Sequence, residues 1–544
     1  MKTWRSRLAS LASLAPLAPG FWAGVTAALA VTLAMVVLRD AFGLASAPEL
    51  VGDRIASLLP VQFFLGLLSL VGGYNNLKAI GVVGVLLGGL AAGGVAGLVY
   101  ARIAERQHAR VPLQMQPLGI SWRAATTVTG LALLFWLLSV AALWFVLPTN
   151  FHGLPAGPAR WSSALTLLGL CIGYVPLLLL AYRILVHREP DKEVLTDPST
   201  LPVVREESVT PRRSLVLGGT AAALTVATGF QLRRVHSRAT FHYDGTEYRG
   251  ADVQAITPND RFYSVTKNIV DPTVKEGLWR LEITGSAARP RGYTLGDVRD
   301  LPAVTQETTL MCISNRVGGG LMSNAVWKGV PLARLLDDAR AGSGVKEVVL
   351  RSVDGYTDTI SIEKAMDPAT LVAFEMNGEP LPRRHGFPAR MIVPGYFGEK
   401  SVKWVTRVEL VDTEKKGFYE QQGWGPSFIV PTRSRFDLPD PKTALRAGAP
   451  TLLKGIAFGG DRGVSRVEVS TDGGGSWQPA RLDYPGTRLT WALWSLEWRP
   501  PAVGEYKLLV RAVDGAGAPQ VAEERDTAPQ GATGYHRITT QVTA

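Results

Sequence analysis

The chain has 544 residues, of which 47% are hydrophobic and 19% charged, and its formal net charge is +11. This length allows two to four domains. The positive charge does not indicate nucleic-acid binding, because many basic residues occupy short loops between apolar runs and the sequence has no zinc-finger spacing or phosphate loop. The two cysteines, Cys171 and Cys312, exclude a disulfide framework, since Cys171 lies inside an apolar run.

The apolar runs in residues 1–230 predict a transmembrane helical region of about six spans. Each run approaches the roughly 20 residues that a helix needs to cross a bilayer. The runs lie at about 21–38, 55–73, 79–101, 124–147, 163–186 and 214–230. The third run has glycines suited to close helix packing, namely Gly88, Gly89, Gly93, Gly94 and Gly97.

Six spans with the N-terminus outside place most basic loop residues inside, as the positive-inside rule favours. The basic N-terminus (Lys2, Arg5, Arg7) conflicts with this arrangement, and one span more or fewer would remove the conflict. The rule predicts a multi-pass protein of the cell membrane with residues 231–544 on the extracytoplasmic side. No charged residue occupies the middle of a run, which speaks against a transporter or sensor whose spans form an ion path.

Arg212 and Arg213 precede the last run in the stretch PRRSLVLG, which resembles a twin-arginine export signal. The alternative is a pair of ordinary positive-inside arginines, and both interpretations place the following residues outside. No histidine lies well inside an apolar run, and the sequence contains neither CxxCH nor an iron–sulfur cysteine cluster. We therefore expect no haem or iron–sulfur group in this chain and interpret the spans as an anchor.

Residues 231–250 predict a polar tether, and 251–440 an α+β domain. Strands are expected at 279–283, 348–350 and 359–362, the last two around a turn at Asp354 and Gly355, with a short helix at 295–298 and another after Pro331. The apolar run 308–313 delivers Cys312 into a glycine-rich loop that also carries Arg316. Such a thiol is a nucleophile, a soft metal ligand or a buried structural cysteine.

Residues 445–544 predict an all-β, immunoglobulin-like sandwich, because alternating strands at 464–469 and 506–510 are followed by Asp-Gly turns. Its tryptophans are expected in the core rather than in a binding site: Trp477, Trp491, Trp494 and Trp498.

Two segments resemble the sulfite oxidase family of molybdopterin enzymes. The first is CISNRVGGGLMSNAVWKGVPL, which begins at Cys312, and the second is the block at 365–410, which contains HGFPAR and SVKW. Residues 445–544 are similar to the C-terminal dimerisation domain of that family. The resemblance implies a molybdenum–molybdopterin cofactor with Cys312 as the protein thiolate on the metal, which exchanges an oxygen atom with a substrate. It also implies a homodimer.

The resemblance further implies which residues bind the pterin and its phosphate, where cations and backbone donors suit an anionic group. These residues are Tyr263, Ser264, Asp354, His385, Arg390, Ser401, Val402 and Lys403.

The substrate pocket departs from the family pattern. An Asn-Arg-Arg sequence is replaced by Asn315-Arg316-Val317, an arginine by Lys267, and a tyrosine near the substrate by about Trp424. A cationic pocket is expected from Lys267, Arg316 and either Arg433 or Arg435. Lysine is not a bidentate partner as arginine is. Sulfite or a related oxyanion leads by family. Reduction of S-oxides or N-oxides and an inactive binding module are the alternatives. Electrons would pass to an external cytochrome or a quinone-linked protein.

Overall fold

The computed structural model describes residues 18–108, 121–186 and 211–544, except for the side chains of 108, 211–215 and 217. The chain forms two compact units. The helical unit comprises Met1–Gly52, Lys78–Leu147 and Ala159–Ala239, and the β-rich unit comprises Asp53–Leu77, Pro148–Pro158 and Thr240–Ala544.

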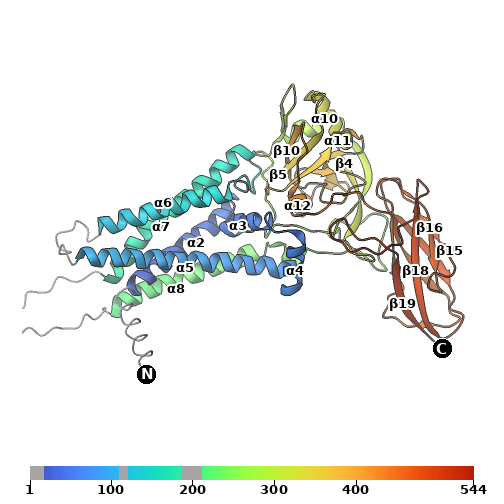
Figure 1. The fold of residues 1–544 in the computed structure, drawn as a ribbon, viewed down its shortest axis with the longest axis horizontal. Helices are drawn as coiled ribbons and strands as arrows, with labels where there is room; N and C mark the ends of the chain where they lie inside the picture. The colour runs from blue at the N-terminus through green and yellow to red at the C-terminus, as the bar shows by residue number, and fades with distance from the viewer. Residues whose placement is uncertain (1–17, 109–120, 187–210) are drawn as a thin grey trace, which may run out of the picture. The chain divides into compact units, whose positions relative to one another are not determined.

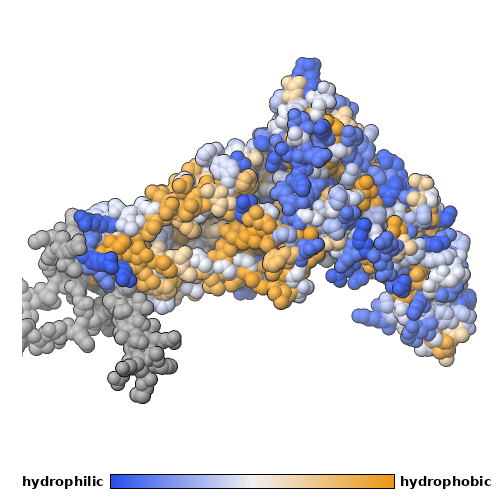
Figure 2. All heavy atoms as spheres, in the orientation of Figure 1, coloured by the Kyte–Doolittle hydropathy of each residue, from blue (hydrophilic) through white to orange (hydrophobic). Residues whose placement is uncertain are grey.

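The helical unit contains long helices whose outer surfaces are apolar. They are α2 (Ala18–Phe42), α5 (Tyr74–His108), α6 (Trp122–Leu143), α7 (Ala156–Val186) and α8 (Pro211–His236) (Figure 1). Among the described residues, α2, α5, α6 and α7 are long and apolar enough to cross a membrane. Large side chains such as Phe135, Leu138 and Phe230 are more than half exposed, and Figure 2 shows apolar atoms over these helices. Such a surface suits lipid rather than water.

The expected span at 55–73 is wrong, because the structure divides this run into short helices. Helix α3 (Ala47–Ala56) ends before Pro60, and α4 (Val61–Val71) ends at Gly72, which adopts a left-handed conformation with φ 76°. Helix α4 has only 11 residues, well short of the roughly 20 needed for a crossing.

One end of α4 joins the core of the β-rich unit. Val61 is buried in one cluster with Met311, Ile313 and Trp424, and its backbone N–H donates to the Gln422 carbonyl at 2.7 Å. Other apolar side chains of α4, such as Phe63 and Leu70, are exposed. Composition alone does not distinguish such a short helix from part of a membrane span.

Helices α2 and α5 approach each other through glycines. A Cβ atom placed on Gly97 would overlap the Gly20 carbonyl oxygen, and one on Gly24 would overlap the Gly93 carbonyl. The expected small-residue face is thus confirmed at Gly93 and Gly97, because only hydrogen side chains allow so close a crossing.

We expect Gly97→Leu to lower the thermal unfolding temperature of the detergent-purified chain, since overpacking typically costs about 1–3 kcal/mol. Gly88→Leu is the matched control on the same helix, because a Cβ at Gly88 meets nothing within 4 Å. Equal unfolding temperatures for the two variants would contradict the glycine-mediated crossing.

Helix α8 also shows that the tether expected at 231–250 is not a separate segment. The helix continues through His236, and Arg238 pairs with Asp40 of α2 at 2.5 Å. After the short 3-10 helix η4 (Thr240–His242), Tyr248 is fully buried and stacks on Trp491. The side chains of Arg212 and Arg213 lie outside the described residues, so the export signal stays a prediction.

The first sheet of the β-rich unit has the strand order β2-β1-β10-β5-β6, with β1 and β10 parallel. The strands are β1 (Leu281–Gly285), β2 (Arg291–Tyr293), β5 (Glu347–Ser352), β6 (Thr357–Ser361) and β10 (Val405–Val411). Three short helices contribute residues to the core of this sheet. They are α9 (Leu295–Asp300), α10 (Leu332–Asp338) and α11 (Ile362–Met366).

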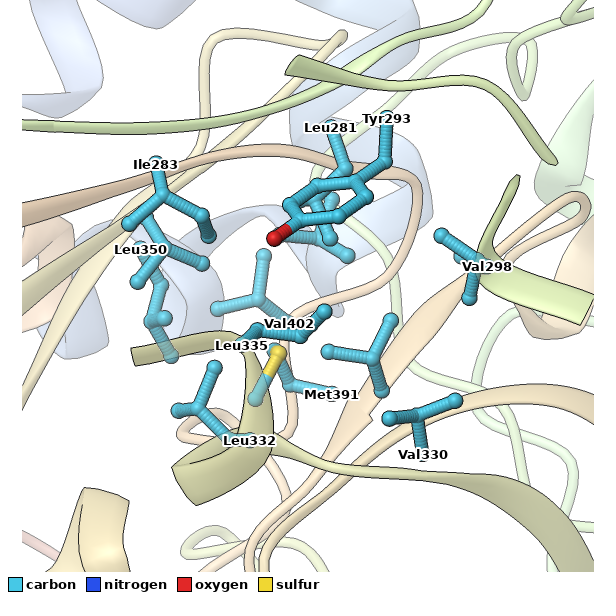
Figure 3. Close-up of a cluster of buried hydrophobic side chains, with 14 of the residues drawn as sticks. Leu281, Ile283, Tyr293, Val298, Val330, Leu332, Leu335, Leu350, Met391 and Val402 are labelled. Carbon is cyan, nitrogen blue, oxygen red and sulfur yellow. The ribbon is translucent and has the colours of Figure 1, made fainter. Parts of the chain in front are cut away.

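Figure 3 shows side chains from these strands, from α9 and α10, and from β4 (Met322–Pro331) and β9 (Arg390–Ile392) pointing toward one another, including Leu281, Val298, Leu335, Leu350 and Met391. The expected strands and the α+β architecture of 251–440 agree with this arrangement.

The second sheet has the order β3-β4-β7-β8, and β9 pairs with β7. Its strands are β3 (Val304–Met311), β4 (Met322–Pro331), β7 (Leu371–Met376), β8 (Glu379–Pro380) and β9 (Arg390–Ile392). The 3-10 helix η5 (Arg383–His385) lies between β8 and β9 in the chain. The apolar residues at 308–311 form the buried end of β3, and this strand delivers Cys312 to a loop as expected.

The C-terminal region contains a four-stranded sheet, β11-β13-β17-β16, and a five-stranded sheet, β12-β19-β18-β14-β15. They comprise β11 (Arg433–Leu438), β12 (Leu445–Arg446), β13 (Thr451–Phe458), β14 (Val464–Ser470), β15 (Gln478–Pro479), β16 (Arg481–Tyr484), β17 (Ala492–Trp498), β18 (Gly504–Asp514) and β19 (His536–Thr543). Both sheets contribute to one core, which contains Trp494 and Trp498. Trp477 is the exception to the expected core tryptophans: it is half-buried, and the Arg511 guanidinium lies 4.1 Å from its ring centroid.

Candidate functional site

The site is built around the end of β3, where Cys312 follows the buried strand. The Cys312 N–H donates to the Leu321 carbonyl at 3.0 Å, and its Sγ shares a 3.1 Å hydrogen bond with the Ser314 hydroxyl. Burial raises the pKa of the Cys312 thiol to about 11. At neutral pH this thiol therefore keeps its proton unless a cation binds the sulfur, which disfavours a free thiolate nucleophile.

Tyr263 and the loop after Gly398 approach this strand end. The Gly398 N–H donates to the Met311 carbonyl at 2.7 Å, and a Cβ on Gly398 would overlap the Tyr263 hydroxyl. Burial, with the Cys312 sulfur nearby, raises the pKa of Tyr263 well above its ordinary value. Tyr263 therefore remains a neutral hydroxyl beside Cys312.

Phe262 links Tyr263 to His385 through ring contacts. Its ring is stacked on Tyr263 and meets the His385 ring edge-on, each with centroids 5.4 Å apart. His385 Nε2 lies 2.8 Å from the Asn259 carbonyl and 3.3 Å from the Arg384 Nε donor. Burial, together with Arg390 and other nearby cations, lowers the pKa of His385 to about 3, so the ring is neutral at neutral pH.

Arg390 is a buried cation with no carboxylate partner among the described residues. Its Nε donates to the Ser401 carbonyl at 3.2 Å, its Nη1 donates to the His385 carbonyl at 3.3 Å, and the guanidinium lies 5.5 Å from the Trp327 ring centroid. Burial lowers the pKa of Arg390 to about 10, which leaves it charged at neutral pH. An uncompensated buried charge is costly, so this position suits an anion that the protein itself does not supply.

Val402 and Lys403 directly follow Ser401 in the chain. The Lys403 Nζ donates to the Arg384 carbonyl at 3.2 Å, and burial lowers its pKa. Val402 is buried in the hydrophobic core, so only its backbone is available for binding. The structure thus brings together Tyr263, Cys312, His385, Arg390, Ser401 and Lys403.

The C-terminal region contributes a second buried arginine. Arg433 of β11 donates from Nη1 to the Asn315 carbonyl at 2.8 Å, in the loop that follows Cys312, and it has no carboxylate partner among the described residues. Burial lowers its pKa to about 10. Arg435 differs, because it pairs with Asp437 at 3.1 Å. Of the two alternatives for the substrate pocket, Arg433 therefore has the available charge.

Three buried polar atoms in this region have no hydrogen-bond partner. They are the Ser264 Oγ, Glu399 Oε1 and Trp424 Nε1 atoms. Buried polar groups almost always have partners, so these atoms are available to bind a ligand or water. Burial and the neighbouring Asp358 raise the pKa of Glu399 well above its ordinary value, so this carboxyl is a proton-carrying group near Tyr263 and Cys312.

The other expected site residues lie apart from this group or are already paired. Lys267 Nζ forms an ion pair with Asp53 at 2.6 Å and donates to the Asp354 carbonyl at 2.7 Å. The Asp354 carboxylate accepts from Asn268 Nδ2 at 2.9 Å. Arg316 is exposed in the loop between β3 and β4.

Sequence reasoning missed two kinds of residue. Glu399 lies two residues before the SVKW motif, but its burial and its oxygen without a hydrogen-bond partner are visible only in three dimensions. Asp53 and Asn150 lie between apolar runs, where nothing in the local pattern indicates that they contact residues more than 200 positions later.

Comparisons with known proteins identify the two domains that contribute residues to this site. The profile for the oxidoreductase molybdopterin binding domain matches residues 268–419, and the profile for the Mo-co oxidoreductase dimerisation domain matches 430–542. Mitochondrial sulfite oxidase of Rattus norvegicus is 33% identical over 309 residues, which cover 48% of this chain and 56% of the rat protein. The chain thus spans little more than half the length of this relative.

Two further relatives extend the comparison. Sulfite oxidase of Gallus gallus is 32% identical over 333 residues, covering 52% of this chain and 72% of that protein. Inducible nitrate reductase [NADH] 1 of Glycine max is 31% identical over 326 residues, covering 48% of this chain and 36% of that protein. With both domains matched in order, the chain belongs to the sulfite oxidase family of molybdopterin-binding oxidoreductases.

Proposed function

We propose that the chain is a membrane-anchored molybdenum-cofactor oxidoreductase that transfers an oxygen atom to or from a small substrate. The observation that carries the proposal is the buried, uncompensated positive charge around Cys312, supplied by Arg390 and Arg433. These cations need an anionic partner to offset the cost of burying them.

The residues present fit a molybdenum–molybdopterin group. Cys312 would hold the metal as a thiolate, and a bound metal cation would oppose the effect of burial on its pKa. Arg390 and Lys403 would neutralise the anionic part of the cofactor. His385 would contact the cofactor as a neutral ring, and the Ser264 hydroxyl would gain its missing partner. Ser401, Val402 and Asp354 would bind or position it mainly through backbone groups. The bound group supplies the two-electron oxygen-atom exchange.

The substrate side is assigned to Arg433 and Trp424. Arg433 would attract an oxyanion, and the Trp424 indole N–H would donate to a substrate oxygen. Oxidation of sulfite is the leading reaction: one water supplies the oxygen atom, and two protons and two electrons leave the site. Lys267 and Arg316 remain predictions as catalytic residues, each in a setting that needs movement to reach Cys312.

Reduction of an S-oxide or N-oxide is the second candidate. The pairing of Lys267 with Asp53 favours it, because this pair removes one of the cations expected to bind a doubly charged oxyanion. A neutral oxide needs fewer cations and one good donor, which Trp424 would provide.

We expect Trp424→Phe to lower kcat/KM about tenfold while leaving the molybdenum content unchanged. The substitution removes the N–H donor but keeps the aromatic ring, and leaving a polar partner unsatisfied costs about 1–3 kcal/mol. Trp494→Phe is the control, because the Trp494 indole N–H is likewise buried without a hydrogen-bond partner but lies in the core of the C-terminal sheets. Unchanged kcat/KM in Trp424→Phe would remove this residue from the substrate pocket.

The membrane arrangement that we propose has five crossings, by α2, α5, α6, α7 and α8. It is supported by the shared unit of 53–77, 148–158 and 240–544, since these segments must then lie on one side of the membrane. Helices α5 and α6 separate the first of these segments, 53–77, from the second, 148–158. Helices α7 and α8 separate the second segment from the domain at 240–544.

Charge supports the same arrangement. The segment 53–77 contains one Arg or Lys residue, Arg54, and the segment 148–158 contains none. Residues 1–17 and 187–210, which this arrangement places inside, contain more basic residues, as the positive-inside rule favours. These are Lys2, Arg5, Arg7, Arg188, Lys192 and Arg205. The N-terminus would then be inside, which removes the conflict of the six-span arrangement, and the catalytic domain would be extracytoplasmic.

The remaining features concern assembly. The two-sheet C-terminal region supports an immunoglobulin-like sandwich that forms a homodimer, as the name of the matching dimerisation domain suggests. Electrons would pass to an external cytochrome or a quinone-linked protein.

The test is metal analysis of the full chain from a host that makes the molybdenum cofactor, followed by a sulfite-dependent acceptor assay. About one molybdenum per chain with sulfite turnover is the expected result. Molybdenum with turnover only of S-oxides or N-oxides would select the second candidate. A folded chain that binds no molybdenum would overturn the proposal.

A further inference from the structure

Two loops that connect membrane-length helices belong to the β-rich unit. They are Asp53–Leu77, between α2 and α5, and Pro148–Pro158, between α6 and α7. Both loops contact the same turn, residues 353–355, between β5 and β6.

The first loop reaches this turn through an ion pair. Asp53 accepts from Lys267 Nζ at 2.6 Å, and the same nitrogen donates to the Asp354 carbonyl at 2.7 Å. The Lys267 side chain is only 7% exposed and that of Asp53 17% exposed. The carboxylate therefore compensates a nearly buried ammonium group that holds the backbone of the turn.

The second loop reaches the turn through its backbone. The Asn150 N–H donates to the Val353 carbonyl at 2.7 Å. Gly355 has φ 75°, and a Cβ atom there would overlap the Thr149 hydroxyl. The Asn150 side chain in turn accepts from the N–H groups of Gly153 and Leu154 at 2.9 and 3.0 Å, which fixes the shape of this loop.

The opposite side of the turn faces the segment that carries Lys403. The Val353 N–H donates to the Trp404 carbonyl at 3.2 Å, and the Asp354 carboxylate accepts from Asn268 Nδ2. Trp404 has φ 52°, an unfavourable conformation for a bulky residue that must be stabilised by its surroundings. The turn therefore connects the two loops to the backbone of Lys403.

We propose that these two loops act as a clasp that fixes the 353–355 turn and, through Trp404, the position of Lys403, with Asp53 as a positioning residue for the cofactor pocket. The part that concerns the cofactor rests on the proposed function. The membrane half of the chain is then a component of the catalytic domain as well as its anchor.

Loss of the Asp53 charge removes the carboxylate that lies 2.6 Å from the nearly buried Lys267 ammonium group. Lys267 would then move toward water and release the Asp354 carbonyl. We expect amide exchange in residues 352–356 and 402–405 of Asp53→Asn to be faster on the order of tenfold, because removing one partner of a buried pair is strongly destabilising. The molybdenum content per chain should fall as well.

The experiment measures hydrogen–deuterium exchange and molybdenum content of the full chain in detergent. Asp53→Glu retains the charge and should restore both values. Asp40→Asn is the matched control, because Asp40 is 13% exposed and pairs with Arg238 in the helical unit. Each protein is prepared from a host that makes the cofactor and from one that does not, so that exchange is compared with and without it.

Unchanged exchange in Asp53→Asn would overturn the clasp. Faster exchange with wild-type molybdenum content would overturn the positioning of the cofactor pocket. A wild-type chain without molybdenum would instead contradict the proposed function. Hydrogen–deuterium exchange in the cofactor-free chain would still decide whether the two loops fix the 353–355 turn.

Discussion

Cys312→Ser should reduce turnover by more than about 100-fold, since even the outer partners of metal ligands are typically worth about 10–100-fold. The substitution replaces a soft sulfur by a hard hydroxyl at the end of β3 and changes the volume very little. The Cys312 N–H bond to Leu321 involves the backbone and is retained. We therefore expect a folded protein with an altered Mo(V) electron paramagnetic resonance spectrum.

Cys171→Ser is the control for this prediction. Cys171 is a free cysteine in α7, so it receives the same chemical change without any expected role in turnover. Turnover by Cys312→Ser near the wild-type rate, measured beside this control, would refute direct binding of the metal by Cys312.

Arg390→Met should cause loss of the cofactor without loss of the fold. Methionine fills similar space, and it removes a buried charge whose burial is costly when no anion is present. The Ser401 and His385 carbonyls lose their hydrogen-bond donor, which lowers the unfolding free energy and offsets part of this gain. We expect the unfolding free energy of the cofactor-free chain to change by about 1 kcal/mol or less, and cofactor retention to fall roughly 100-fold, equivalent to about 3 kcal/mol.

Arg435→Met should behave in the opposite way. Arg435 pairs with Asp437, which is 1% exposed at its side chain, so the substitution leaves a buried carboxylate unpaired. Such a loss costs about 3–5 kcal/mol in the unfolding free energy, with or without cofactor. Thermal unfolding and molybdenum analysis of both variants distinguish the two cases. A cofactor-free Arg390→Met chain as unstable as Arg435→Met would show that Arg390 is a structural residue.

Local patterns were sufficient for several elements. The alternation at 279–283 and 348–350, the Asp354-Gly355 turn and the apolar approach to Cys312 all correspond to observed strands and turns. Each of these features depends on neighbours in the chain, so the sequence expresses it directly. The motifs HGFPAR and SVKW likewise identified His385, Arg390 and Ser401, which the structure joins by hydrogen bonds.

The run at 55–73 shows where local patterns fail. Its composition satisfies a membrane span, but Pro60 interrupts it and Val61 packs beside Met311 in the β-rich unit. An apolar side chain gains similar free energy from lipid and from a protein core, so hydrophobicity alone does not distinguish the two. The expected span at 55–73 is wrong for this reason.

By itself, the sequence determined the division into an apolar helical half and a β-rich half, the strand that carries Cys312, and the family to which the motifs belong. Only the tertiary structure decided which charges are available. It pairs Lys267 with Asp53 and Arg435 with Asp437, and leaves Arg390 and Arg433 without a carboxylate partner among the described residues. The reason is physical: the free energy of a charge depends on burial and on neighbours that are distant in the chain.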